Sequence, residues 1–117
     1  MHAIADTHAL VWYLLNDPRL SPAAKAAFTM AAAQGQLIGI PTISIVEIIY
    51  LTEKGRIPQA ALTSLQSQLS SQQTVLQVIS LDEAVSFRVQ QINRTTVPEM
   101  PDRIIAATAL AYALPLL

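Results

Sequence analysis

The sequence predicts a single α/β domain with three layers, in which helices cover both faces of a central parallel sheet. Short apolar runs typical of strands alternate along the chain with longer segments of helical periodicity. No glycine hairpin joins neighbouring strands, so successive strands should lie parallel and be connected through helices. With 117 residues and 52% apolar content, the chain can bury the core of one domain but not of two.

Strands are predicted where apolar and β-branched residues form short runs. These runs are 3–5, 37–40 and 75–81, and a further strand begins at residue 115. Helices are predicted where apolar residues recur at helical spacing between capping residues and prolines. These segments are 7–16, 23–33, 44–54, 58–69, 83–92 and 101–113. Strand and helix therefore alternate from end to end, without an internal repeat or a linker.

Several helix ends are marked by residues that favour them. Ser21 is expected to cap the second helix, and Gly35 and Gly55 follow the second and third helices where a left-handed residue commonly ends a helix. Ser44 and Glu47 fit a capping box, in which each side chain satisfies a backbone donor of the other residue. We therefore expect the third helix to begin near Ser44.

Composition excludes several classes of protein. Seven basic and eight acidic residues give a net charge of −1, which excludes a strongly basic protein that grips nucleic acid by charge alone. The absence of cysteine excludes disulfides, thiolate metal sites and a cysteine nucleophile, and suits a reducing cytosol. Charged residues make up only 13% of the chain, so surplus apolar surface is expected to meet a partner.

One long uncharged stretch, residues 26–46, is not expected to cross a membrane. Glutamine, glycine and proline interrupt it between residues 34 and 41. The first residues also lack the basic region and long apolar region of a signal peptide. We expect a soluble, cytoplasmic protein without a membrane contact.

Three acids lie where a parallel sheet places its ligands. Asp6 directly follows the first strand, and Glu47 and Asp102 lie near the starts of later helices. Ligands bind beyond the carboxyl ends of the strands in open α/β sheets, and carboxylate oxygens suit Mg²⁺ or Mn²⁺. Such an ion activates water and clamps the oxygens of a transferring phosphoryl group. We expect the three carboxylates to meet around a divalent metal.

Each acid also has a structural alternative. Asp6 is placed to cap the helix that follows it, and Glu47 belongs to the capping box. Asp102 lies in a first helical turn, where the helix dipole favours negative charge. Taken singly, each acid is more easily structural than catalytic.

Other polar and aromatic residues receive lesser roles. Thr7 and Ser44 are candidates for supporting the site, Thr7 by orienting Asp6 or a metal-bound water. His8 is expected to be a packed or capping residue rather than a general base, because no second histidine lies at ligand spacing. Trp12 is expected in the core or in a dimer contact rather than as a platform for stacking bases. Most basic residues are expected to be surface solubilisers.

The ordered set of motifs resembles a known family. Asp6-Thr7-His8, followed by leucine and tryptophan residues, resembles the opening of PIN-domain proteins of the VapC toxin type. Three further segments resemble later parts of that family, in order and at similar spacing. They are the second acidic motif at 44–47, the turn at 54–57 and the third motif at 101–109. The resemblance covers essentially the whole chain.

This resemblance implies a PIN-like three-layer α/β/α fold and a metal-dependent endoribonuclease that uses Mg²⁺ or Mn²⁺. It implies that Asp6, Glu47 and Asp102 carry both the metal and the catalysis, and that the substrate is RNA. It also implies the toxin of a type II toxin–antitoxin pair, with a cognate antitoxin protein lying across the active-site groove. Toxins of this type commonly form homodimers.

The chain departs from the family pattern at one place. The family usually carries a further acid shortly after the strand that begins here at Pro115, and none follows through Leu117. We therefore expect a single PIN-like domain over 1–117 that lacks its C-terminal end. One alternative is a catalytically silent or truncated module that only binds its antitoxin or another protein. A receiver-type regulatory domain is disfavoured, since no paired acids precede Asp6 and no lysine follows a late strand.

Overall fold

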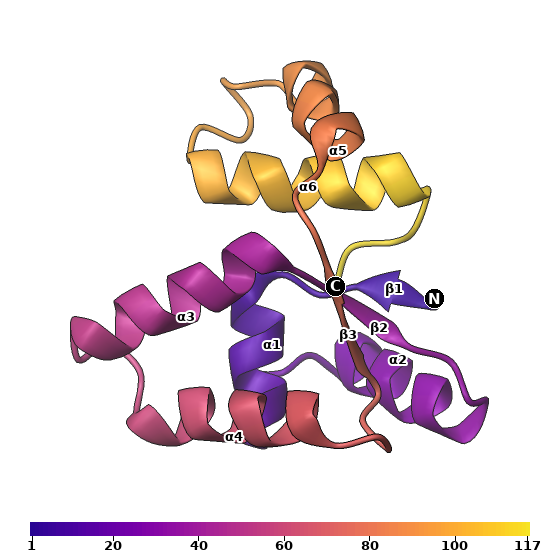
Figure 1. Cartoon of the computed structure of the whole chain (residues 1–117), viewed down its shortest axis with the longest axis vertical. Helices are drawn as coiled ribbons and strands as arrows, with labels where there is room; N and C mark the ends of the chain where they lie inside the picture. Colours follow the sequence, from indigo (N-terminus) through magenta and orange to yellow (C-terminus); the bar gives the residue numbers. More distant parts are fainter.

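The computed structural model describes residues 1–117 and contains one parallel β-sheet (Figure 1). Its strands are β1 (Ala3–Ile4), β2 (Ile38–Pro41) and β3 (Leu76–Ile79). They lie in the order β1-β2-β3, with Ile4 opposite Gly39 and Gly39 opposite Gln77. On the free side of β1, Leu116 forms a single parallel bridge with Ile4. The expected strand at Pro115 is therefore present as this bridge.

Helices cover both faces of the sheet. They are α1 (Thr7–Leu14), α2 (Pro22–Ala33), α3 (Thr42–Glu53), α4 (Gln59–Ser70), α5 (Glu83–Arg88) and α6 (Met100–Tyr112), with a short 3₁₀ helix at Val89–Gln91. In Figure 1, α5 and α6 lie above the sheet, whereas α1, α2 and α4 lie below it. The predicted α/β/α architecture with a parallel sheet is confirmed. None of these helices is both long and apolar enough to span a bilayer.

The two faces of the sheet carry cores of unequal size, because successive side chains of a strand point to opposite faces. Ala3 and Ala5 belong to a cluster of 13 buried residues that includes side chains from α1 to α4. Ile4, between them, packs with Ile79 and with Ala109 of α6. The larger core therefore lies on the face of the sheet that is covered by α1 to α4, and α1 begins directly after Asp6.

Gly39 lies at the centre of β2, where the smaller core closes most tightly over the sheet. A Cβ atom added there would lie 2.5 Å from Cδ1 of Ile4 and 3.1 Å from Cγ1 of Ile79. The absence of a side chain at Gly39 thus lets the two isoleucines meet over the middle strand.

Several predicted helix ends are confirmed. The Ser21 hydroxyl accepts a hydrogen bond from the Ala24 N–H at 3.1 Å and caps α2. Gly35 and Gly55 adopt left-handed conformations, with φ of +66° and +70°, just beyond α2 and α3. Asp82 caps α5 by accepting from the Val85 N–H at 2.9 Å.

The predicted capping box is wrong. The third helix begins at Thr42, directly after β2, with Pro41 as the N-cap residue and no side-chain cap. Pro41 has φ of −59°, and a fixed φ near this value favours entry into a helix without a polar cap. Ser44 consequently lies inside the first turn, where it is fully buried. The side chains of Ser44 and Glu47 therefore do not cap α3 and can make other contacts.

Two other predicted segments are shorter than expected. The strand predicted to residue 81 ends at Ile79, because β2 offers no pairing partner beyond Pro41. The helix predicted to residue 92 ends at Arg88 and continues only as the 3₁₀ helix. The guanidinium of Arg103 on α6 donates to the backbone carbonyls of Val89 and Ile92, which secures this tighter end.

Candidate active site at the carboxyl edge of the sheet

Asp6 lies directly beyond β1, as the alternation of strand and helix predicts. Its Oδ1 accepts a hydrogen bond from the Ala9 N–H at 2.8 Å, so the side chain caps α1. Asp6 is therefore the N-cap residue of α1, as the structural alternative for this acid predicted. A carboxylate has a second oxygen, however, and no residue of the chain donates a hydrogen bond to Oδ2 of Asp6. Asp6 is half-buried, and its second oxygen makes no hydrogen bond within the chain.

The backbone that carries Asp6 is held from both sides. The Ala5 N–H donates to the Gly39 carbonyl at 3.0 Å, on the side of β2. The Asp6 N–H donates to the Leu117 carbonyl at 3.4 Å, on the opposite side. The position of Asp6 is thus set by the sheet rather than by a free loop.

Thr7 links the start of α1 to α3. Its Oγ1 lies 2.5 Å from Oε1 of Glu47 and 3.2 Å from Oγ of Ser44. A hydroxyl has one proton and an ionised carboxylate only accepts, so Thr7 donates to Glu47 and can accept from Ser44. Thr7 is 4% exposed and Ser44 is 0% exposed. The buried hydroxyl of Thr7, itself bonded to that of Ser44, therefore holds the carboxylate of Glu47 against the helix that Asp6 caps.

Asp102 lies apart from this link. It is an exposed residue in the first turn of α6, a helix whose N-cap residue Glu99 makes no side-chain cap. Helix α6 packs on α3, and Figure 1 shows its first turn above the N-terminal half of α3. Across residues 1–117, no three histidine, aspartate or glutamate side chains lie close enough together to hold a metal ion. Glu47 is thus hydrogen-bonded to Thr7, the residue next to Asp6, but Asp6, Glu47 and Asp102 do not form one cluster.

The chemistry of these side chains nevertheless fits a hard divalent cation. The chain contains one ion pair, between Arg19 and Asp17, so no lysine or arginine neutralises Asp6, Glu47 or Asp102. Mg²⁺ is usually bound by one or two carboxylates and keeps water and phosphate oxygens in its remaining positions. Asp6 and Glu47 offer such carboxylates at the carboxyl edge of the sheet.

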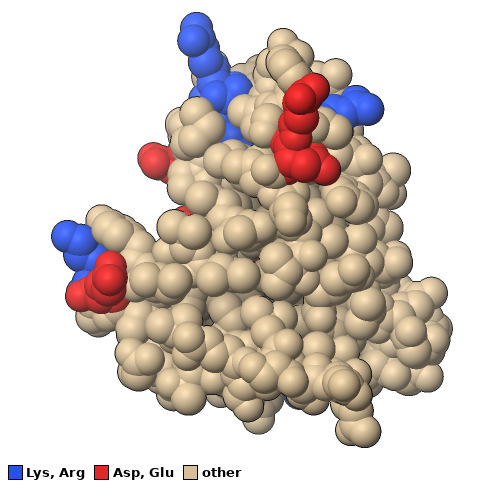
Figure 2. Space-filling view, viewed as in Figure 1, with Lys and Arg blue, Asp and Glu red and all other residues tan.

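Charged side chains are unevenly distributed over the face of the molecule that Figure 2 shows. Figure 2 shows them over α5, α6 and the far end of α3, whereas the surface over α4 carries no charge in this view. Helix α4 indeed contains no charged residue. This face therefore offers no cationic track for a nucleic acid.

A pocket of about 320 Å³ adjoins Asp6. Its wall includes His8 and Trp12, whose ring centroids lie 5.8 Å apart with the planes inclined by 50°. From the sequence, His8 is predicted to be a packed or capping residue. In the structure, His8 is exposed and lines the same pocket as Asp6. The i, i+4 spacing of His8 and Trp12 on one helix is the signal that could have grouped them.

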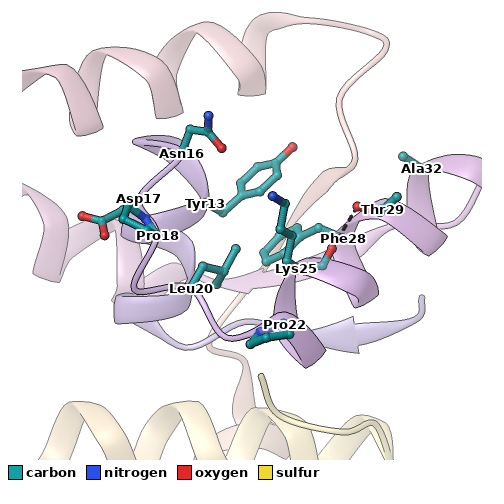
Figure 3. A pocket seen from close by; sticks show the side chains of 10 residues that line it. All are labelled: Tyr13, Asn16, Asp17, Pro18, Leu20, Pro22, Lys25, Phe28, Thr29 and Ala32. Atoms are coloured by element: carbon teal, nitrogen blue, oxygen red, sulfur yellow. Dashed lines mark hydrogen bonds between the residues drawn. The ribbon is translucent and has the colours of Figure 1, made fainter.

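A larger pocket of about 800 Å³ lies between α1 and α2 and contains none of the three acids (Figure 3). Within it, the ring of Tyr13 stacks on that of Phe28 at a centroid distance of 4.0 Å, and the side chain of Lys25 lies beside Tyr13. Size alone would favour this pocket as a ligand site. The smaller pocket is the better candidate because a carboxylate at the strand edge forms part of its wall.

Comparisons with known proteins agree with this description. A family model described as PIN domain matches residues 3–117. The fold is similar to that of VapBC2 from Rickettsia felis bound to a DNA fragment from their promoter, with a TM-score of 0.71 and 20% identity over 99% of this chain and 86% of that chain. It is also similar to a toxin–antitoxin complex from Klebsiella pneumoniae, with a TM-score of 0.64 and 22% identity over 97% and 82% of the two chains. No curated protein matches the sequence.

Proposed function

Because this chain belongs to the PIN-domain family, we propose that it is a metal-dependent endoribonuclease that cleaves an RNA phosphodiester. We further propose that it is the toxin of a type II toxin–antitoxin pair. PIN domains are generally nucleases, which supports hydrolysis of a phosphodiester as the reaction class. RNA as the substrate is part of the proposal.

The contact between Thr7 and Glu47 carries this proposal. It brings the carboxylate of α3 to the end of β1 that bears Asp6, although the two segments are 40 residues apart. Neither carboxylate has a cationic partner within the chain. Each of these two half-buried carboxylates accepts one hydrogen bond, and a cation would compensate the charge that these bonds leave. Binding of a divalent cation would explain why the two carboxylates lie at this edge of the sheet.

Asp6 and Glu47 are the residues that would hold Mg²⁺ or Mn²⁺, and Asp102 would join them only if the first turn of α6 came closer, because the three acids do not form one cluster in this structure. Such an ion supplies a water of lowered pKa and electrostatic stabilisation of the phosphate oxygens. Asp6 contributes its uncapped Oδ2, while its Oδ1 keeps the carboxylate in one orientation by capping α1. Thr7 is a positioning residue because its hydroxyl fixes Glu47, and Ser44 supports the Thr7 hydroxyl. Neither hydroxyl contacts metal or RNA in this assignment.

Protein partners form part of the same proposal. Both similar solved structures contain toxin–antitoxin assemblies, which supports a cognate antitoxin as one partner. Val46, Ile49 and Tyr50 on α3 are between 40% and 54% exposed and share one helix face. An apolar helix face of this kind supports a protein contact, either with an antitoxin or within a homodimer.

A calorimetric titration with manganese tests the metal site without any assumption about which RNA is cut. The unmodified chain should bind manganese, and the Asp6→Asn variant should lose this binding. Asp82→Asn is the matched control, because Asp82 caps α5 in the same way that Asp6 caps α1. Cleavage of a labelled RNA that requires manganese and stops with EDTA would then complete the assignment. Equal binding by the unmodified chain and Asp6→Asn would contradict it.

A second candidate function is a catalytically silent module that binds a protein partner. It is favoured by the hydrogen bonds of the acids themselves, because Asp6 caps a helix and Glu47 ties α3 to Thr7. Both bonds stabilise a fold without any metal. On this alternative, the folded chain binds no manganese and cleaves no RNA, yet still captures its antitoxin in a binding assay.

A further inference from the structure

The pocket beside Asp6 has the composition of a base-binding site. Its volume of about 320 Å³ lies at the lower end of the range of about 300–1,000 Å³ that is typical of ligand pockets. This volume suits one flat ring system better than a helix or a strand of a partner protein. The wall is formed mainly by Asp6, His8, Trp12, Leu20, Ala24 and Leu117.

Trp12 and His8 form the aromatic part of this wall. Trp12 is the sole tryptophan of the chain and is half-buried, so its ring contributes to the core while remaining partly accessible. His8 is exposed, and its ring is inclined to the indole ring at a centroid distance of 5.8 Å. Two rings one helical turn apart thus border the pocket without filling it. Such rings bind nucleobases by stacking, which tolerates any base.

A cation completes the surroundings of Trp12. The guanidinium carbon of Arg19 lies 5.6 Å from the centroid of the Trp12 ring. Arg19 also forms an ion pair with Asp17 at 2.8 Å, so an acid compensates its charge. A chain segment that enters the pocket therefore meets a carboxylate at Asp6 and the aromatic rings next to it, while Arg19 lies outside the pocket wall.

This combination of a carboxylate and aromatic rings matches a nucleotide better than a peptide. With a net charge of −1, the chain cannot obtain its affinity for RNA from charge alone. Stacking can supply affinity that charge does not. From these observations we propose that Trp12 and His8 form a nucleobase subsite, in which a base adjacent to the cleaved phosphate stacks. This inference rests on the proposed nuclease function.

The fluorescence of Trp12 provides the first test, because no other tryptophan contributes to the signal. The Asp102→Asn variant, with magnesium present, is titrated with a short single-stranded oligoribonucleotide and with its abasic counterpart. A stacked base should quench or shift the emission, and the abasic chain should leave the emission unchanged. Equal responses to both oligonucleotides, or no response to either, would overturn the subsite.

Substitution of Trp12 provides the second test, with binding measured by the anisotropy of a labelled oligonucleotide. Trp12→Leu should weaken binding about 5- to 150-fold, the range that corresponds to the loss of one aromatic stacking contact. Trp12→Phe should retain most of the affinity. Phe87→Leu is the matched control, since Phe87 is a 64% exposed aromatic residue of α5, on the other side of the sheet. Circular dichroism verifies that each variant is folded.

The outcomes separate this inference from the function on which it rests. RNA cleavage that persists in Trp12→Leu with unchanged affinity would overturn the subsite and leave the nuclease intact. Base-dependent quenching without cleavage under any metal would support base binding at Trp12 but overturn the nuclease. A response of Trp12 to an apolar peptide, but not to oligonucleotides, would assign the pocket to a protein partner and overturn the subsite.

Discussion

The hydroxyl of Thr7 lies 2.5 Å from Oε1 of Glu47, across a separation of 40 residues. This contact connects the carboxyl end of β1 to the first half of α3, and the buried hydroxyl of Ser44 supports it. A donor without charge thus holds a carboxylate in place and leaves its negative charge unneutralised. An ion pair in the same position would have cancelled that charge.

Thr7→Val tests whether this hydroxyl positions Glu47. Valine has nearly the same shape but no donor, so Glu47 and Ser44 both lose their partner. Affinity for manganese and RNA cleavage should fall about 10- to 100-fold, as for other groups that orient metal ligands. The free energy of unfolding should fall by about 1–3 kcal/mol, because a buried hydroxyl is left unpaired. Thr7→Ser keeps the donor and should behave like the unmodified chain. Unchanged manganese affinity in Thr7→Val would show that Glu47 needs no positioning.

Asp6 should show separable structural and functional roles. Asparagine caps helices about as well as aspartate, so Asp6→Asn should abolish metal-dependent cleavage with little change in stability. Asp6→Ala should also lower the free energy of unfolding by about 0.5–2 kcal/mol. Asp82→Ala removes the equivalent cap of α5 and should cost a similar amount of stability without affecting cleavage. Urea unfolding and an RNA cleavage assay measure the two effects. Cleavage that is retained in Asp6→Asn would limit Asp6 to capping.

Glu47→Gln should reduce activity far more than stability. Glu47 does not cap α3, which begins five residues earlier, at Thr42, and glutamine can still accept the hydrogen bond from Thr7. The loss of stability should be about 1 kcal/mol or less, the difference between a charge-assisted and a neutral hydrogen bond. Metal-dependent cleavage should be lost. Glu53→Gln, at the exposed end of the same helix, should change neither property. A large loss of stability in Glu47→Gln would mean that the carboxylate is chiefly structural.

Gly39→Ala should destabilise the sheet through steric overlap. The new methyl group would lie 2.5 Å from Cδ1 of Ile4, a side chain that is fully buried. Overpacking of this kind typically lowers the free energy of unfolding by about 1–3 kcal/mol. Ile4→Val removes the clashing methyl group, so the double variant should be more stable than the sum of the two single effects predicts. Strictly additive effects, measured by urea unfolding, would contradict this packing.

Tyr13 should make the fold sensitive to alkaline pH. Burial raises the pKa of the Tyr13 phenol above its ordinary value of 10.0, so the folded chain holds this proton more tightly than the unfolded chain does. The corresponding stability is fully present below about pH 10 and decreases as the pH rises from there through the raised pKa. Tyr13→Phe should remove this part of the pH dependence in unfolding measurements, whereas Tyr112→Phe, at an exposed position, should not. Parallel pH profiles of the unmodified chain and Tyr13→Phe would refute the role of this phenol.

The fold could be predicted because its signals are local. Alternating apolar runs and helical stripes indicate a parallel sheet covered by helices, and Ser21 and Gly35 mark helix ends by their own conformational preferences. The capping box failed because Ser44 and Glu47 have the same spacing whether the serine precedes a helix or lies in its first turn. Pro41 decided between these possibilities by starting the helix directly after β2.

The candidate site was only partly predictable. Parallel topology implies that Asp6 lies at the carboxyl edge of the sheet, and the structure places it there. The bond between Thr7 and Glu47 depends on how α1 packs against α3, which no local pattern encodes. The grouping of His8 and Trp12 with Asp6 around one pocket likewise depends on side-chain directions and on the position of Leu117.

The pairing of β1 with residues 115–117 has a consequence for the growing chain on the ribosome. The ribosome synthesises Asp6 long before residues 115–117, yet the Ile4 N–H donates to the carbonyl of Pro115, and the Leu117 N–H donates to the carbonyl of Ile4. A nascent polypeptide that has not reached residue 115 has β1 as an unpaired edge, and the neighbourhood of Asp6 is unfinished. The earliest-made part of the candidate site is therefore among the last to be completed.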